Sequence, residues 1–133
     1  MAIEWKPSFE TGIVEVDTDH RRLVALINEL EAILAEGGEA ARIGAVIDAL
    51  MDYADYHFKR EEGMMRRFGY AELASHEDAH VQFGQFLGDL VGNCMLNPTL
   101  DTARVLQEYL QHWLVDHILT EDMKYVPFLR DRV

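Results

Sequence analysis

Apolar residues recur every three or four positions along most of the chain, which is the spacing of amphipathic α-helices. The first such stretch predicts a helix over about residues 18–36. Asp17 or Thr18 is the expected N-cap, because short polar side chains accept a hydrogen bond from the first free backbone N–H groups. Gly37 and Gly38 follow the last apolar position and predict the end of this helix.

Three further stretches have the same period. The longest predicts a helix over about residues 40–68. A third helix is expected over about residues 71–93. The fourth is expected over about residues 100–122, with Thr99 or Asp101 as its N-cap.

Four amphipathic helices with short connections, without a strand pattern or an internal repeat, predict an all-α fold, an antiparallel up-down four-helix bundle. Residues 1–16 fit neither the helical nor the strand period, so we expect an ordered N-terminal arm laid over the core. The tail, residues 123–133, contains an apolar stretch with Pro127, which predicts a break or a short capping segment. Residues 1–133 are expected to form a single domain.

Charge narrows the choice of partners. The chain has 24 acidic and 12 basic residues and a formal net charge of -12, which repels phosphate backbones and anionic lipid surfaces. No apolar run approaches the about 20 residues of a membrane-spanning helix, and the start lacks the pattern of a secretory signal. We therefore expect no nucleic-acid partner, no membrane insertion and a cytoplasmic location.

The six histidines are unevenly distributed over the predicted helices. His112 lies off the apolar stripe of its helix and is expected on the surface. The others lie on apolar stripes, and every predicted helix supplies at least one of them. His76 and His80 are four residues apart, as are His57 and Glu61, so the members of each pair lie on one helix face. The five inward-facing histidines are His20, His57, His76, His80 and His117.

Five imidazoles and a carboxylate in one core would be costly without a partner, so the pattern indicates a bound cation. Cys94 is the only cysteine and is expected to be a small buried apolar residue, so neither a disulfide nor a thiolate cluster can form. A metal must therefore use His and carboxylate ligands. One ligand stays open at this point: Glu121 lies one helical turn after His117, whereas Asp122 is rotated about 140° away unless a π-bulge brings it round.

Four segments in this order resemble the motifs of the hemerythrin family, specifically the single-domain bacteriohemerythrins. The resemblance covers nearly the whole chain, and four spaced motifs are far more specific than one. One departure is the pair Thr18-Asp19 before the first histidine, where relatives often carry Gln or another polar residue. The segments are Trp5 to Leu23 with His20, His57 to Glu62 with Met65, His76 to Phe83 with His80, and Trp113 to Tyr125 with His117 and Asp122.

The resemblance implies two iron ions per chain with an oxo or hydroxo bridge. One iron would be bound by His76, His80 and His117, the other by His20 and His57. Glu61 and Asp122 would bridge them, so the resemblance favours Asp122 over Glu121 and implies a helix irregularity before Asp122. Counting these ligands leaves one coordination position open, at the His20/His57 iron, where dioxygen would bind.

The resemblance also implies a function, reversible dioxygen binding by a carrier or store that is not an enzyme. We expect a monomer, with an oxygen-consuming enzyme as a candidate recipient. A ferritin-like oxidase is disfavoured because the chain has only one Glu-x-x-His, at residues 77–80. A sensor of oxygen, nitric oxide or redox state that uses the same site is the alternative, and a purely structural bundle is the weakest candidate. Candidates for a dry wall around the oxygen are Leu23, Ile27, Tyr53, Phe58, Phe83 and Trp113.

Overall fold

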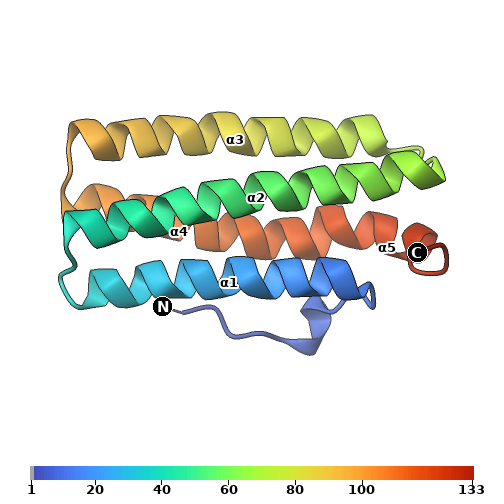
Figure 1. Cartoon of the computed structure of the whole chain (residues 1–133), viewed down its shortest axis with the longest axis horizontal. Helices are drawn as coiled ribbons and strands as arrows, with labels where there is room; N and C mark the ends of the chain where they lie inside the picture. The colour runs from blue at the N-terminus through green and yellow to red at the C-terminus, as the bar shows by residue number, and fades with distance from the viewer. Residues whose placement is uncertain (1) are drawn as a thin grey trace.

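The computed structural model describes residues 2–133 and consists of four long helices that run alternately up and down (Figure 1). The residues it describes contain no strand. Helix α1 packs against α2 and α4, and α3 packs against α2 and α4, so the four helices enclose one core. The predicted all-α up-down bundle is therefore confirmed. Its helices are α1 (Val14–Ala35), α2 (Ala40–Phe68), α3 (Leu73–Leu96) and α4 (Leu100–His117).

The start of α1 differs from the prediction. The helix begins at Val14, inside the segment expected to belong to the arm, and neither Asp17 nor Thr18 is its N-cap. The Asp17 carboxylate instead accepts hydrogen bonds from the backbone N–H and hydroxyl of Thr11, at 2.8 and 2.7 Å. Asp17 thus binds the loop that precedes it instead of the helix N–H groups that follow it. The predicted N-cap is therefore wrong.

The connections between the helices follow ordinary turn chemistry. Gly37 and Gly69 adopt the left-handed conformation, with φ of +75° and +73°, which glycine reaches without steric cost. Thr99 is the N-cap of α4, as one of the two predicted candidates, and forms a reciprocal capping box with Thr102. Helix α3 begins at Leu73 and continues to Leu96, so both of its ends lie later than expected.

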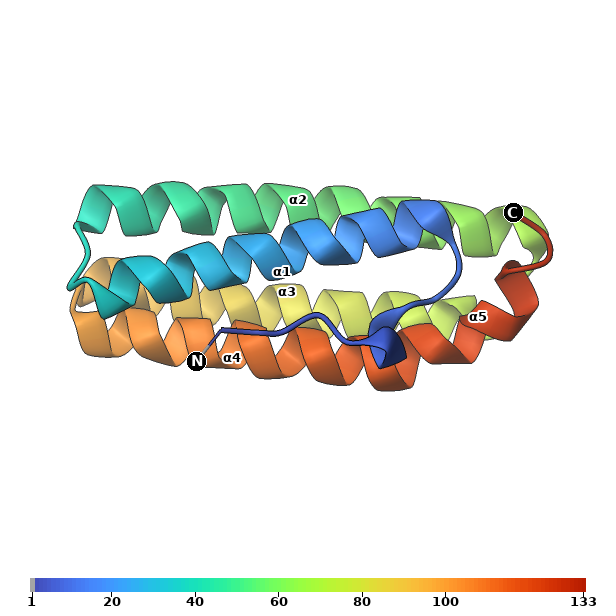
Figure 2. The same ribbon diagram turned by 90° about the horizontal axis from the view of Figure 1, so that it is seen from below.

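The N-terminal arm lies along the side of the bundle, across α1 and α4 (Figure 2). It contains a 3-10 turn, η1 (Pro7–Phe9), whose Phe9 is buried. The backbone of Ile3 exchanges two hydrogen bonds with the side-chain amide of Asn28 in α1, at 2.7 and 2.9 Å. The arm is therefore ordered, as predicted, although it is shorter than residues 1–16.

The C-terminal part of the chain continues the direction of α4. A π-helix, η2 (Ile118–Asp122), follows α4 directly and leads into α5 (Met123–Leu129) at the end of the bundle (Figure 1). Of the two alternatives predicted for the tail, the break at Pro127 is wrong, because Pro127 lies inside α5, and the short capping segment is confirmed as α5 itself. Burial of Tyr125 and Leu129 on α5 offsets the hydrogen bond that proline removes.

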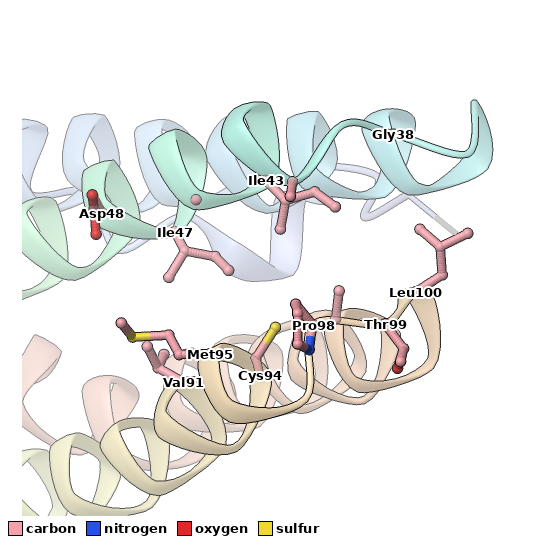
Figure 3. A pocket seen from close by; sticks show the side chains of 13 residues that line it. Gly38, Ile43, Ile47, Asp48, Val91, Cys94, Met95, Pro98, Thr99 and Leu100 are labelled. Atoms are coloured by element: carbon pink, nitrogen blue, oxygen red, sulfur yellow. The ribbon is translucent and has the colours of Figure 1, made fainter.

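The opposite end of the bundle contains a cavity of about 360 Å³ between α2 and the α3–α4 connection. Figure 3 shows Ile43 and Ile47 of α2 facing Val91 and Cys94 of α3 across this space. Cys94 is half-buried rather than buried, because its side chain borders the cavity. None of the helices in the described part of the chain is both long and apolar enough to span a bilayer.

Candidate metal centre

Seven buried His, Glu and Asp side chains from all four long helices and η2 meet in the bundle core. Each is at most 4% exposed, although Asp and Glu are almost never buried without a partner. Their inward direction follows from the helical spacing, since residues four apart lie on one face. The seven are His20 from α1, His57 and Glu61 from α2, His76 and His80 from α3, His117 from α4 and Asp122 from η2.

The Glu61 carboxylate lies at the middle of this group. Its Oε1 atom is 3.4 Å from His57 Nε2, 3.6 Å from His76 Nε2 and 3.3 Å from His80 Nε2. Its Oε2 atom lies 3.9 Å from His20 Nε2 and accepts a hydrogen bond from the hydroxyl of Tyr125. Glu61 therefore reaches histidines on three helices.

Asp122 faces the same centre from the opposite side. Its Oδ1 atom is 3.0 Å from His117 Nε2 and 3.2 Å from His76 Nε2, and its Oδ2 atom is 3.0 Å from His20 Nε2. The competing residue Glu121 is partly exposed and pairs with Lys124 at 3.1 Å. The π-helix causes this difference, because its extra residue rotates Asp122 into the core. The helix irregularity predicted before Asp122 is confirmed.

Many polar atoms of these side chains have no hydrogen-bond partner. The distances above allow ion pairs, yet no hydrogen bond within residues 2–133 reaches these atoms. A buried polar atom without a partner costs about 1–3 kcal/mol. A group of such atoms at one point therefore needs an explanation. A cation supplies it, since imidazole and carboxylate are the usual ligands of iron and zinc. The atoms that face the centre are Nε2 of all five histidines, Oε1 of Glu61 and both carboxylate oxygens of Asp122; Nδ1 of His20, the other nitrogen of a ring whose Nε2 faces the centre, also has no hydrogen-bond partner.

The potential ligands form two groups that share Glu61. One group comprises Glu61, His76, His80 and His117, and the other comprises His20, His57, Glu61 and Asp122. Within each group the ligand atoms lie within 4.8 Å of one another. Asp122 also approaches the first group through Oδ1, so both carboxylates reach both groups. The arrangement suits two metal ions, one with three imidazoles and one with two.

Two of the histidines are held by a second carboxylate behind the ring. His57 Nδ1 is 2.9 Å from Asp19 Oδ2, and His80 Nδ1 is 2.7 Å from Glu62 Oε2. An ionised carboxylate can only accept, so the proton of each ring lies on Nδ1. The Nε2 lone pairs then point into the centre, as metal coordination requires.

Aromatic rings fix the imidazoles on the side of α3 and α4. Phe58 stacks on His80 with ring centroids 3.8 Å apart, and Trp113 stacks on His117 at 4.3 Å. Phe83 stacks in turn on Trp113 at 3.9 Å. These contacts restrict the orientation of two histidines and keep water away from them.

An apolar void of about 20 Å³ lies next to the ligand layer. Leu23, Ala54, Phe83 and Leu114, each three residues from a buried histidine, contribute to its lining. A void of this size could hold one water molecule, but aliphatic and aromatic walls offer no hydrogen bond, so it stays dry. The predicted wall residues Leu23, Ile27, Phe58, Phe83 and Trp113 line this void; Tyr53 does not, since its hydroxyl bonds to Asp19.

Without metal, protons balance the charges of the centre. Burial by itself lowers the pKa of His57 and His76, but Glu61, Asp122 and, for His57, Asp19 raise these pKa values to about 10 and about 9. Burial tends to raise the pKa of Glu61, yet the neighbouring histidines hold it well below its ordinary value. Without metal, His57 and His76 therefore hold protons opposite the ionised carboxylates of Glu61 and Asp122. A metal ion must displace these protons.

The stability of the metal-free protein should therefore fall at alkaline pH. The raised pKa values of His57 and His76 stabilise the fold fully below their ordinary value of 6.5, and this contribution is lost as the pH rises through about 9 and 10. The lowered pKa of Glu61 stabilises the fold above its ordinary value of 4.5, and this contribution is lost only as the pH falls below that value. Urea unfolding at pH 6 and pH 10 should show lower stability at pH 10. The metal-loaded protein is the control and should change less; an equal loss in both forms would contradict the interpretation.

The structure brings together all seven side chains that the sequence pointed to, and His112 is exposed, as predicted. Three further residues contact them: Asp19, which the sequence placed beside the ligands without a partner, and Glu62 and Tyr125, to which it assigned no role. Each left a signal: Asp19 and Glu62 directly adjoin His20 and Glu61, and Tyr125 lies three residues after Asp122 on the same helix face. Adjacency alone does not tell which ring a side chain reaches.

Comparisons with known proteins agree with this geometry. The profile of the Hemerythrin HHE cation binding domain matches residues 11–129. A bacteriohemerythrin of Methylococcus capsulatus is 34% identical over 126 residues, covering 91% of each chain. One of Pseudomonas aeruginosa is 32% identical over 126 residues, covering 95% of this chain and 80% of that protein. A crystal structure of wild-type hemerythrin superimposes with a TM-score of 0.85 at 31% identity, covering 98% of this chain and 99% of that chain. The chain therefore belongs to the hemerythrin family.

Proposed function

We propose that the protein binds dioxygen reversibly at a pair of iron ions and acts as an oxygen carrier or store, not as an enzyme. The observation that carries the proposal is the convergence of unsatisfied His, Glu and Asp atoms beside a dry apolar void. In this proposal His76, His80 and His117 hold one iron, and His20 and His57 hold the other. Glu61 and Asp122 bridge the two ions.

The unequal division of the histidines supports a binding role. Metal sites that bind small ligands keep a coordination position open, whereas saturated sites are structural. The group with only two imidazoles is the one that would leave a position free. The void borders both groups of ligands, and on the two-imidazole side Leu23 and Ala54 of its lining lie one turn from His20 and His57, so a diatomic molecule could reach this position without crossing polar surface.

The chemistry that a bound iron pair supplies is a reversible transfer of electrons to dioxygen. The residues of this chain protect that exchange by excluding water and protons. The buried hydroxyl of Tyr125 donates to Glu61, and burial together with Glu61 and Asp122 raises the pKa of Tyr125 well above its ordinary value. Tyr125 therefore retains its proton.

A spectrum recorded through one oxygen cycle tests the proposal. The protein is loaded with ferrous iron without air, and its absorption is recorded before air is admitted, after it is admitted and after it is removed. A visible band that appears with oxygen and disappears without it supports a carrier or store. Rapid irreversible oxidation with a change in structure would refute carriage and favour a sensor. The monomeric state, the cytoplasmic location and an oxygen-consuming enzyme as recipient stay predictions.

Two histidine variants distinguish a proposed buried ligand from an exposed histidine. His80→Ala removes a proposed ligand and should weaken iron binding by more than the about 10–100-fold typical of losing an outer hydrogen-bond partner. His112→Ala changes an exposed histidine on α4 and should retain both the iron and the oxygen-dependent band. Iron analysis after desalting measures both. Unchanged iron in His80→Ala, or loss of iron in His112→Ala, would show that the ligand set is wrong.

A further inference from the structure

Asp19 is a buried carboxylate of α1 whose two oxygens are bound by three groups of α2. Its Oδ2 atom accepts from His57 Nδ1 at 2.9 Å and faces Arg60 Nε at 3.2 Å. Its Oδ1 atom accepts from the hydroxyl of Tyr53 at 3.0 Å. The Asp19 side chain is only 1% exposed. Donors on both oxygens, one of them a guanidinium group, hold this carboxylate in its ionised form and in one orientation.

The contact between Asp19 and His57 acts on the side of the centre that has fewer imidazoles. Of the two histidines in that group, His20 has a buried Nδ1 atom without a hydrogen-bond partner among residues 2–133. His57 is thus the one ring of this group with a carboxylate behind it. The other group has one such ring as well, His80, but its partner Glu62 is 21% exposed.

This difference in exposure decides which carboxylate has the stronger effect. The attraction between two charges grows as the effective dielectric constant falls, and it is weakest in water. The Asp19 side chain is 1% exposed, whereas water screens the charge of Glu62; Arg60, itself 29% exposed, offsets part of the Asp19 charge. The negative charge of Asp19 therefore acts more strongly on its imidazole and on a cation at Nε2.

We propose that Asp19 is a positioning residue that fixes the Nδ1–H form of His57 and shifts the two-imidazole metal position toward the more highly charged oxidation state. A carboxylate behind a metal-bound imidazole raises the basicity of the ring and stabilises the higher charge of a ferric ion. In this way Asp19 compensates that position for its missing third imidazole. The inference rests on the proposed di-iron function, but its test needs no oxygen binding.

The test measures reduction potential and metal affinity in the iron-loaded protein. Asp19→Asn keeps the size of the side chain and an acceptor oxygen but removes the charge. We expect about 10–100-fold weaker metal binding. A tenfold loss of preference for ferric over ferrous iron would raise the potential by about 59 mV for a one-electron step. Asp55→Asn is the matched control, because Asp55 is an exposed residue of α2 that pairs with Lys59 at the surface, at 2.8 Å.

Two further variants keep the test decisive if Asp19→Asn folds poorly. Tyr53→Phe retains the ring but removes the donor to Asp19 Oδ1, so more of the negative charge acts on His57 and the potential should fall. Glu62→Gln should raise the potential, but less than Asp19→Asn, because Glu62 is more exposed.

The results separate this inference from the proposed function. Potentials of Asp19→Asn and Tyr53→Phe that match Asp55→Asn would overturn the role of Asp19, even if the wild-type protein binds oxygen reversibly. A shift of the potential in Glu62→Gln that equals or exceeds the shift in Asp19→Asn would also overturn it, because burial would then not make Asp19 the stronger of the two carboxylates. A wild-type protein that takes up two irons but no oxygen would refute the proposed function and leave this test intact.

Discussion

Replacing Glu61 by alanine should abolish binding of the metal pair. Glu61 is fully buried and belongs to both potential ligand groups. Its Oε1 atom lies within 3.6 Å of the Nε2 atoms of three histidines. Loss of a bridging ligand removes a bond from each ion at once, so affinity should fall by well over the about 100-fold upper range for an outer partner. Metal content after dialysis measures the effect.

Glu121→Ala is the matched control for this variant. Glu121 is a glutamate of the same size that an uninterrupted α-helix would place below His117, but it pairs with Lys124 at the surface. The variant should bind two metal ions as the wild type does. Retention of metal in Glu61→Ala, or its loss in Glu121→Ala, would show that the carboxylates have been assigned to the wrong roles.

Removal of the metal should strongly destabilise the protein. A metal that binds only the folded chain contributes about 2.7 kcal/mol for each site when its free concentration is about 100 times Kd. Two such sites would contribute about 5 kcal/mol, which corresponds to a fall in Tm of roughly 15–25 °C for a chain of this size. The physical reason is the set of buried nitrogen and oxygen atoms that no protein group satisfies.

Thermal unfolding followed by circular dichroism, before and after chelation, measures this loss. The His80→Ala variant is the control, because a protein that has already lost a ligand should respond much less to the chelator. Equal Tm values for the chelated and the loaded wild type would mean that the centre is satisfied without a cation.

Much of the fold could be predicted from the chain because the relevant signals are local. Spacing of three and four residues fixed the helices and, with them, the faces on which the five histidines lie. The start of α1 could not be predicted in this way. Asp17 looks like an N-cap, but its carboxylate bonds to Thr11, a partner that only the path of the arm brings close.

The seventh ligand shows where periodicity stops being sufficient. Regular helix geometry favours Glu121, and nothing in the local pattern requires a π-turn. The resemblance to hemerythrins favoured Asp122, and the structure places its carboxylate 3.0 Å from His117. An irregular turn of this kind is stabilised by tertiary contacts, which a helical period does not contain.

The outer contacts of the centre were harder to predict than its inner ones. The inner histidines share a face with apolar residues, which a single sequence reveals. Asp19 and Arg60 are charged residues near helix surfaces and look like ordinary solvent-facing positions until α1 and α2 are packed together. Their relation to His57 depends on the packing of α1 against α2.

The inserted residue in η2 has a consequence beyond Asp122. Each additional residue turns all later positions of a helix by about 100° about the axis. The phase of α5 relative to α4 is therefore set by η2, and with it the direction in which Tyr125 meets Glu61. A regular α-helix of the same length between His117 and Asp122 would place Glu121 instead of Asp122 at the core and swing Tyr125 away in the same step. One insertion thus sets the orientation of both Asp122 and Tyr125, so neither can change register without the other.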